Sequence, residues 1–376
     1  MKDDKKVPQL RFPEFTDAWK QRELNEIADT IDTGKSIFSK SNIGKFKILG
    51  STGVIGFDED YDYEGSFLLT ARVGANAGNL YRSSGKVKIT DNTVFIKSKF
   101  IDYLFYSLEK FNLKRLSFGT GQPLIKSSEL KKLNISVPCD ENEITKIEHF
   151  FITIDRTITL QQRKLNSLQK LKKGLLQKMF PKKGENIPEI RFPKFSDAWK
   201  QRELCSLTKR IQGNDGRMDL DILTISAGNG WMKQEERFSG NIAGKEQKNY
   251  TLLHKGELSY NHGNSKLAKY GAVFSLQNFE EALVPRVYHS FKMLSGSAKF
   301  IEYYFATKLP DRELGKLISS GARMDGLLNI KYDDFMGIKL TIPSEMEQHK
   351  ISTFFSKLDN TITLQQRWLF YTHKQS

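Results

Sequence analysis

The chain has 376 residues, of which 38% are hydrophobic and 27% charged, and this composition is typical of a globular protein with two or three domains. No apolar run approaches the ~20 residues that span a bilayer, and the charged N-terminus lacks the apolar stretch of a signal peptide, so we expect a cytoplasmic protein without membrane contact. A formal net charge of +15 favours a polyanionic partner, most often a nucleic acid. Neither cysteine, Cys139 or Cys205, has a CxxC partner, so no structural metal or disulfide framework is expected.

Two segments of the sequence each occur twice in the chain. RFPEFTDAWKQREL at 11–24 returns at 191–204 with two changes, and FFITIDRTITLQQRKL at 150–165 returns in modified form at 354–369. Such self-similarity is the signature of an internal structural repeat. The sequence therefore predicts two copies of one structural frame.

The two centres inside this frame, at about 25–125 and 205–330, share almost no identity. In the first centre the β-rich runs KFKILG, SFLLTARVG, KVKIT and TVFIK precede a helix predicted at FIDYLFYSLEKF. In the second centre DILTIS, GELSYN, YGAVFSL and YHSFKML precede a helix predicted at AKFIEYYFATKL. Each centre is thus predicted to be a mixed α/β domain.

A long helix is predicted after each centre. Mostly apolar residues recur at steps of three and four from 144 to 179, which is the heptad pattern of a coiled coil and predicts a helix on the order of 54 Å long. Gln161 and Gln365 occupy matching positions of the two patterns, and a buried glutamine needs a polar partner. We therefore expect the helices to pack antiparallel with the two glutamines close together. Two unrelated amphipathic helices, each packed on its own domain, remain the alternative. The expected seam and docking residues are Ile144, Ile147, Phe151, Ile154, Ile158, Gln161, Leu165, Leu168, Ile351, Phe355, Leu358, Ile362, Gln365 and Leu369.

These elements predict an α+β fold with two mixed α/β domains, joined by two long helices that form an antiparallel coiled coil with an internal pseudo-twofold repeat. The predicted divisions are an N-terminal repeat segment at 1–24, a first domain at 25–139, a first helical spacer at 140–180, a linker with the second repeat segment at 181–204, a second domain at 205–343 and a second helical spacer at 344–372.

Two loops carry side chains suited to reading nucleic acids. TARVGANAGNLYR from Thr70 and SYNHGNSKLAKYG from Ser259 combine amide, guanidinium and aromatic groups with glycine. Amides and guanidinium groups read base edges, whereas lysines and backbone amides hold phosphates. Glycine-rich polar loops are also often simple turns, and that interpretation stays open. With further polar and basic residues of the two centres, the candidate nucleic-acid-binding residues are Thr70, Arg72, Asn76, Asn79, Arg82, Lys88, Thr120, Gln122, Tyr260, Asn261, His262, Asn264, Lys266, Lys269, Arg286 and Arg323.

Motifs for catalysis are absent from the sequence. There are no adjacent prolines for the Pro-Pro-aromatic motif of amino-methyltransferases, and no Walker lysine follows a glycine-rich loop. The acidic clusters lack the downstream ExK of a common nuclease core, and His262 has no visible nucleophile or metal partner. The sequence therefore predicts a non-catalytic binding subunit with no catalytic or metal-binding residues.

The repeated RFPEFTDAWKQREL, the stretches ARVGANAGNLYR, YNHGNSKLAKYGAV and EALVPRVYHSF, and the helix TLQQRKLNSLQKLKKGLLQKMF together resemble the specificity subunit of a Type I restriction-modification enzyme, over essentially the whole chain. The resemblance implies two target recognition domains in inverted orientation, each reading one half of a split, asymmetric sequence in double-stranded DNA. It also implies that the helical spacers dock two methylation subunits, which bring S-adenosylmethionine and methylate adenine. Two restriction subunits would bring an ATP-driven motor and nuclease with ATP and Mg, and this chain itself would bind no cofactor.

One feature departs from the family pattern. The second helical repeat lacks at least seven positions of the first, which puts the completeness of the second docking site in doubt. Two other functions remain open: a stand-alone methyltransferase or nuclease, which the missing motifs disfavour, and an RNA-binding or assembly scaffold with coiled-coil arms.

Overall fold

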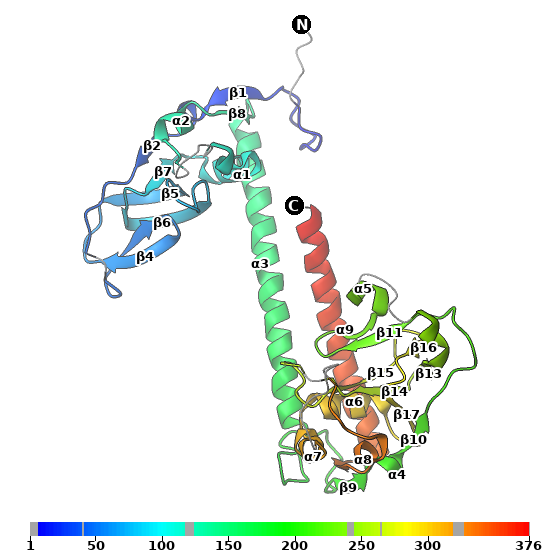
Figure 1. Ribbon diagram of the computed structural model, residues 1–376. Coiled ribbons are helices and arrows are strands. Elements are labelled where there is room, and N and C mark those ends of the chain that lie inside the picture. Colours follow the sequence, from blue (N-terminus) through cyan, green and yellow to red (C-terminus); the bar gives the residue numbers. More distant parts are fainter. Residues whose placement is uncertain are drawn as a thin grey trace. The chain divides into compact units, whose positions relative to one another are not determined.

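The computed structural model describes residues 7–39, 41–116, 124–238, 244–263, 265–318 and 327–375. The chain divides into two compact units, residues 1–160 and 161–376. The long helix α3 (Glu141–Lys178) begins in the first unit and ends in the second (Figure 1). The finer divisions predicted from the sequence, with separate helical spacers, stay a prediction.

The first unit is built on a six-stranded sheet of order β2-β7-β5-β6-β3-β4. The central strand β5 buries its last five residues, and Phe67 and Leu69 belong to one hydrophobic cluster while Leu68 belongs to another. Because side chains alternate along a strand, this division means that both faces of the sheet are covered. The elements of the unit are β1 (Lys20–Glu23), η1 (Leu24–Glu26), β2 (Thr30–Thr33), β3 (Phe46–Gly50), β4 (Gly53–Asp58), β5 (Tyr63–Ala71), β6 (Leu80–Ile89), β7 (Thr93–Lys97), α1 (Ile101–Phe111), η2 (Leu113–Leu116), α2 (Ser127–Lys131), β8 (Asn134–Val137) and the start of α3.

The second unit contains a four-stranded sheet of order β10-β17-β14-β15 and three two-stranded sheets. Its largest core cluster gathers aromatic rings from β14, β17, α6 and α8, with Tyr260 and Phe335 stacked at 4.2 Å between ring centroids. The elements are β9 (Lys200–Glu203), α4 (Leu204–Leu207), β10 (Thr208–Ile211), β11 (Leu223–Ser226), β12 (Gly230–Lys233), α5 (Gln234–Phe238), η3 (Gly244–Asn249), β13 (Thr251–His254), β14 (Leu258–Asn261), β15 (Ala272–Ser275), β16 (Glu281–Val284), β17 (His289–Met293), α6 (Ala298–Ala306), α7 (Asp311–Lys316), α8 (Tyr332–Met336), β18 (Lys339–Ile342) and α9 (Glu345–Gln375).

The repeated sequence folds the same way in both units. The first Lys-Gln-Arg-Glu forms β1, which pairs antiparallel with β8, and the second forms β9, which pairs antiparallel with β18. Lys20 lies opposite Val137 and Lys200 opposite Ile342, each on the last strand before a long helix. The shared frame predicted from the repeat is therefore confirmed.

A buried ion pair fastens each repeat to the first turns of its helix. Arg11 donates from Nε and Nη2 to the two carboxylate oxygens of Glu143 at 2.6 and 2.8 Å. Arg191 holds Glu347 in the same way, with both bonds at 2.7 Å. Only 1% of either glutamate side chain is exposed. These bidentate contacts raise the pKa of Arg11 and Arg191 above the ordinary value, so both guanidinium groups stay charged.

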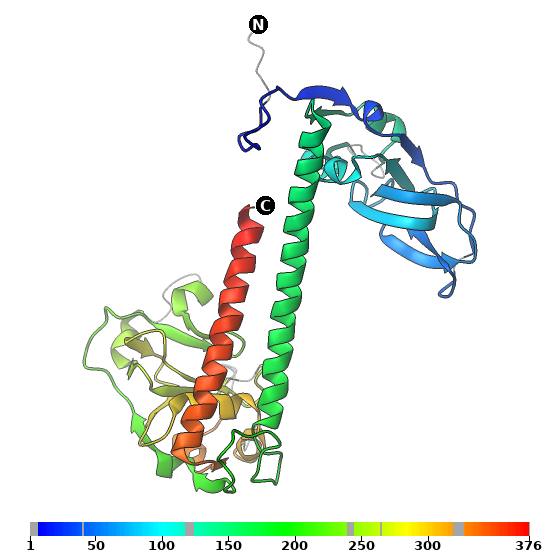
Figure 2. The ribbon, with the colours of Figure 1, turned by 180° about the vertical axis from the view of Figure 1, so that it is seen from behind.

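Within the second unit, the end of α3 packs antiparallel on α9. Gln365 donates from Nε2 to Oε1 of Gln161 at 2.7 Å, and Lys172 pairs with Asp359 at 2.5 Å. From the first of these contacts to the second, the residue number rises along α3 and falls along α9, so the two helices run antiparallel. Figures 1 and 2 show them side by side over this stretch. The antiparallel packing and the paired glutamines predicted from the sequence are confirmed.

The heptad seam is covered over only part of its length. Residues of the second unit are covered, with Leu165, Ile351, Phe355, Ile362 and Leu369 no more than 9% exposed, and Leu168, Leu358 and the glutamines half-buried. In the first unit Ile144 is buried and Ile147 and Ile158 are half-buried, but Phe151 is 39% and Ile154 36% exposed. The apolar surface at these two positions is therefore open to solvent, and their role as docking residues stays a prediction.

Candidate nucleic-acid interface

In the first unit, the loop that follows β5 is held against a segment far along the chain. Val73 forms an isolated antiparallel bridge with Leu124, and the amide of Ile125 donates to the carbonyl of Arg72 at 2.8 Å. Gly78 has a positive φ, and a Cβ there would come within 2.6 Å of the backbone nitrogen of Lys114. The glycine therefore lets the loop lie directly on η2.

The loop that follows β14 in the second unit is held in the same way. Gly263 forms an isolated antiparallel bridge with Leu327, and the amide of Leu328 donates to the carbonyl of His262 at 2.8 Å. In both units the strand before the loop is central in its sheet, and the bridging residue precedes a short helix, α2 in the first unit and α8 in the second. Two centres without readable identity thus build one backbone arrangement, which we call the bridged loop: residues 72–79 in the first unit and the described residues 261–263 and 265–271 in the second.

The bridged loop of the first unit presents three of the predicted candidates. Arg72, Asn76 and Asn79 are half-buried, and Asn79 donates from Nδ2 to Oδ1 of Asn76 at 3.3 Å. The Arg72 guanidinium lies 3.4 Å from the carbonyl oxygen of Asp91 and makes no carboxylate contact among the described residues. Its charge is therefore available to an anionic partner. Thr120 and Gln122 lie outside the described residues.

In the second unit the lysines of the loop are exposed, whereas its asparagine is engaged. Asn261 donates from Nδ2 to the carbonyl of Ile225 at 3.1 Å and accepts from the Gly263 amide at 3.0 Å, so it shapes the loop. Lys266, Lys269 and Arg286 are exposed, and the Lys269 ammonium lies 5.2 Å from the Tyr270 ring centroid. Asn264 and Arg323 lie outside the described residues.

Four predicted DNA contacts have internal roles instead. Thr70 and Tyr260 have no exposed surface, and the Tyr260 hydroxyl donates to the carbonyl of Tyr270 at 2.7 Å. Lys88 is 8% exposed and donates to the carbonyl of Ile37, with Asp58 and Asp62 nearby. His262 is 5% exposed, and its ring nitrogens lie 2.6 and 2.9 Å from two backbone carbonyl oxygens. Side chains buried in this way do not reach a DNA surface in this conformation.

Arg82 is also committed to the protein. Its guanidinium pairs with Asp102, lies 3.3 Å from Asp155 and stacks over the Phe105 ring at 4.1 Å from the centroid. Two carboxylates and an aromatic face satisfy this cation, so we assign it a structural role.

Sequence reasoning missed two cations that the fold brings to the first bridged loop. Lys114 and Arg115 lie on η2, against which Gly78 packs, and both are exposed. The run LKRL that carries them is a basic signal, but its place beside residues 72–79 depends on a contact between segments far apart in the sequence.

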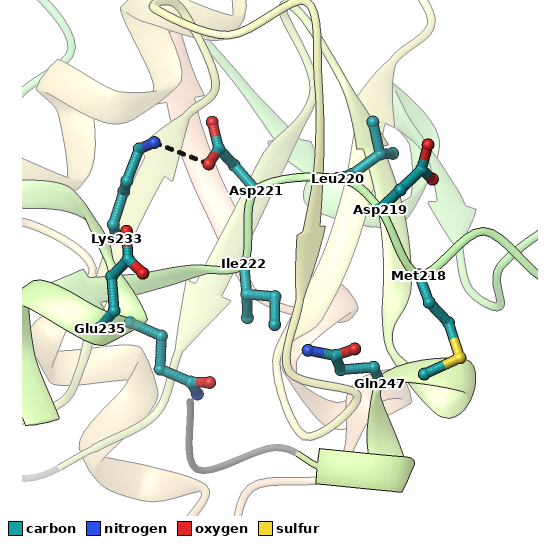
Figure 3. Close-up of a pocket in the computed structure, with 9 residues that line it drawn as sticks. Met218, Asp219, Leu220, Asp221, Ile222, Lys233, Glu235 and Gln247 are labelled. Atoms are coloured by element: carbon teal, nitrogen blue, oxygen red, sulfur yellow. Dashed lines mark ion pairs between the residues drawn. The ribbon is translucent and has the colours of Figure 1, made fainter. Parts of the chain in front are cut away.

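A recess in the second unit was not predicted either (Figure 3). Asp219, Asp221 and Glu235 contribute carboxylates to its lining, and Lys233 pairs with Asp221 at 2.7 Å. This acidic lining repels phosphate, so it does not extend the candidate interface. Among the described residues, no group of three His, Cys, Asp or Glu side chains could hold a metal ion, and no helix is long and apolar enough to cross a membrane.

A stacked pair of histidines, of which His262 is buried and His289 half-buried, supports the second bridged loop. The rings of His262 and His289 stack at 4.9 Å between centroids, and His289 contacts the carbonyl of Ile330 at 2.9 Å through Nε2. Burial lowers the pKa of His289 to about 4, so this ring is neutral at physiological pH. The pair therefore ties the loop to the segment that bridges it.

A family model described as "Type I restriction modification DNA specificity domain" matches the chain twice, over residues 16–170 and 200–369. The chain belongs to this family. The two matches cover most of the sequence and correspond to the two copies of the frame. Membership favours the DNA-specificity interpretation over the RNA-binding scaffold.

Relatives of known name agree with this family. The chain is 28% identical over 160 residues to "Type I restriction enzyme EcoprrI specificity subunit" of Escherichia coli, a match that covers 40% of each chain. It is 36% identical over 119 residues to "Type I restriction enzyme MjaVIII specificity subunit" of Methanocaldococcus jannaschii, which covers 29% of this chain and 27% of that one. The matches thus span less than half the length of these relatives.

A solved structure shows the same fold. The Type I restriction-modification system S subunit from M. genitalium matches with a TM-score of 0.58 at 12% identity, over 94% of this chain and 92% of that one. The expected architecture of two mixed α/β domains with long helices is therefore confirmed at the level of the fold.

Proposed function

We propose that this chain is the DNA-binding specificity subunit of a Type I restriction-modification complex, and that each unit reads one half of a split, asymmetric sequence in double-stranded DNA. The observation that carries the proposal is the bridged loop, which recurs in both units with different side chains. One backbone arrangement with unlike side chains suits a protein that reads two different half-sites. The repeated frame, by contrast, suits two equivalent docking positions.

The charges support different roles for the half-buried and the exposed residues of the candidate interface. We propose that Arg72 and Asn76 read base edges in one half-site, because guanidinium and amide groups make bidentate contacts with guanine and adenine. Lys114, Arg115, Lys266, Lys269 and Arg286 would hold phosphates, which positions the protein without reading sequence. The net charge of +15 favours such contacts and makes the affinity depend on salt.

The chain would contribute recognition and no chemistry. We propose that two methylation subunits dock on the helical frame and bring S-adenosylmethionine, and that two restriction subunits bring ATP, Mg and the nuclease. The complex, and not this chain alone, would methylate adenine and cleave DNA, and it would act in the cytoplasm.

Reconstitution with a methylation subunit tests this function. DNA carrying random sequence is incubated with S-adenosylmethionine and either the chain alone or the chain with its partner, and modified adenines are mapped. We expect no modification by the chain alone, and a single two-part motif with a fixed unread spacer when the partner is present. Methylation by the isolated chain, or modification without a sequence motif, would contradict the proposal.

A further inference from the structure

The second unit contains a filled aromatic site at the start of α9. Phe355 is fully buried, 5.2 Å from Tyr303 and 5.3 Å from Phe354 between ring centroids. Phe180, just beyond the end of α3, lies 6.3 Å from Phe355, stacks on Phe300 at 5.5 Å and meets Trp199 at 5.8 Å. Phe180 is itself 2% exposed. It therefore fills the centre of this group of rings.

The first unit contains an equivalent set of aromatic rings around the same position. Phe150 and Phe151 match Phe354 and Phe355, and their rings are 5.5 Å apart. Phe12 packs on Phe150 at 6.1 Å as Phe192 packs on Phe354 at 5.8 Å, all between centroids. We name the aromatic site of the first unit the N-terminal seat; it comprises Phe12, Trp19, Tyr103, Tyr106, Phe150 and Phe151.

The remaining contacts of the N-terminal seat are matched as well. Tyr106 lies 4.7 Å from Phe151, and its hydroxyl donates to Asp155 at 2.6 Å, as Tyr303 donates to Asp359 at 2.8 Å. Trp19 meets Tyr103 edge-on at 6.4 Å, where Trp199 meets Phe300 edge-on at 5.8 Å. The walls of the site are thus built in both units.

The two sites differ in what fills them. Phe151 is 39% and Phe150 45% exposed, whereas Phe355 has no exposed surface and Trp199 is 3% exposed. Among the described residues of the first unit, no aromatic ring contacts both Trp19 and Phe151, as Phe180 contacts both Trp199 and Phe355 in the second. Adjacent exposed phenylalanines on one helix face mark an interaction site, because covering them removes apolar surface from water.

We propose that the N-terminal seat binds, in trans, a helix end of the same kind as residues 175–181, Leu-Leu-Gln-Lys-Met-Phe-Pro. The second unit shows which chemistry fits these walls: a phenylalanine enters between the rings, and Met179 beside it is 4% exposed. The partner therefore carries a methionine-phenylalanine pair at the end of a helix. This contact goes beyond DNA reading and needs no DNA.

A peptide-binding experiment on the full chain tests this proposal. A fluorescein-labelled peptide that copies residues 168–190 of this sequence is titrated with the protein, and its fluorescence anisotropy is followed. We expect saturable binding, and about tenfold weaker binding to the Phe151→Ala variant, because truncating a central aromatic anchor removes much of the interaction. A peptide carrying Phe180→Ser should not bind.

Two controls make the outcome decisive. Leu364→Ala removes an apolar side chain on α9 that is 65% exposed, and it should leave binding unchanged. Circular dichroism checks that Phe151→Ala is folded, which its partial exposure favours. Absence of peptide binding, or equal binding to wild type and Phe151→Ala, would overturn the proposal. A wild-type dimer that Phe151→Ala dissociates in the absence of peptide would also overturn it, because Phe180 of a second copy is buried in its own second unit and a different surface of that copy would then cover the N-terminal seat.

Discussion

The buried ion pair between Arg191 and Glu347 gives a prediction about stability, and the equivalent pair in the other copy of the repeat provides a control. Glu347 is 1% and Arg191 12% exposed, and Nη1 of Arg191 has no hydrogen-bond partner among the described residues. Replacing Glu347 with alanine removes both bonds to the guanidinium and leaves a mostly buried cation without a counter-charge. Breaking a buried pair costs about 3–5 kcal/mol, and we expect about 3 kcal/mol because Arg191 keeps some access to water.

Urea unfolding, followed by tryptophan fluorescence, measures this change. Trp199 is 3% exposed in the same unit, so its emission reports on the loss of that core. Glu143→Ala is the matched variant in the first unit, where Arg11 holds the equivalent glutamate. The double change Arg191→Met with Glu347→Leu should recover most of the loss, since no unpaired charge remains. A loss below about 1 kcal/mol for Glu347→Ala, or a double variant less stable than the single one, would refute this reasoning.

Three further predictions concern the second unit and the helices. Burial lowers the pKa of His289 to about 4 in the folded chain, so the unfolded chain binds a proton at this ring at higher pH than the folded chain does. The contribution of the neutral ring to the free energy of unfolding is therefore complete above the ordinary histidine pKa and is lost as the pH falls toward 4. The loss should be about 2 kcal/mol between pH 7 and pH 5, and His289→Gln should reduce it in urea unfolding. Gln161→Leu should cost about 1–3 kcal/mol in thermal unfolding, because Gln365 loses its partner, whereas leucine at both positions should be nearly neutral; a double variant as unstable as the single one would count against the pairing. Inserting one heptad near 158 and one near 362 should lengthen the unread DNA spacer without changing either half-site, as methylation mapping would reveal.

Patterns local in sequence predicted much of the fold. TVFIK coincides with β7, and the apolar periodicity of FIDYLFYSLEKF gives α1 to within a residue. Gln161 and Gln365 were predictable as partners because the duplicated helix places them at equivalent seam positions, and a buried amide needs a partner. The repeat itself predicted that β1 and β9 would have equivalent places.

The candidate site was less predictable, because it depends on contacts distant in sequence. One backbone hydrogen bond, from the amide of Ile125 to the carbonyl of Arg72, orders the first bridged loop, and no sequence pattern predicts this bond. Thr70 and Tyr260 were predicted to be exposed loop residues because their side chains are polar. Both lie instead on central strands that are covered on both sides, and neither has exposed surface. The neighbourhood of Lys114 and Arg115 depends on the close packing of Gly78.

The central claim is that each unit reads its own half-site. The most direct measurement is the methylation motif produced, together with a methylation subunit, by Arg72→Ala and separately by Asn261→Ala. Arg72→Ala should relax bases in one half of the motif only, since a bidentate base contact is worth about 1–3 kcal/mol, and Asn261→Ala should disturb only the other half through its loop. A motif in which the Arg72 substitution altered the half that Asn261 controls would contradict the account.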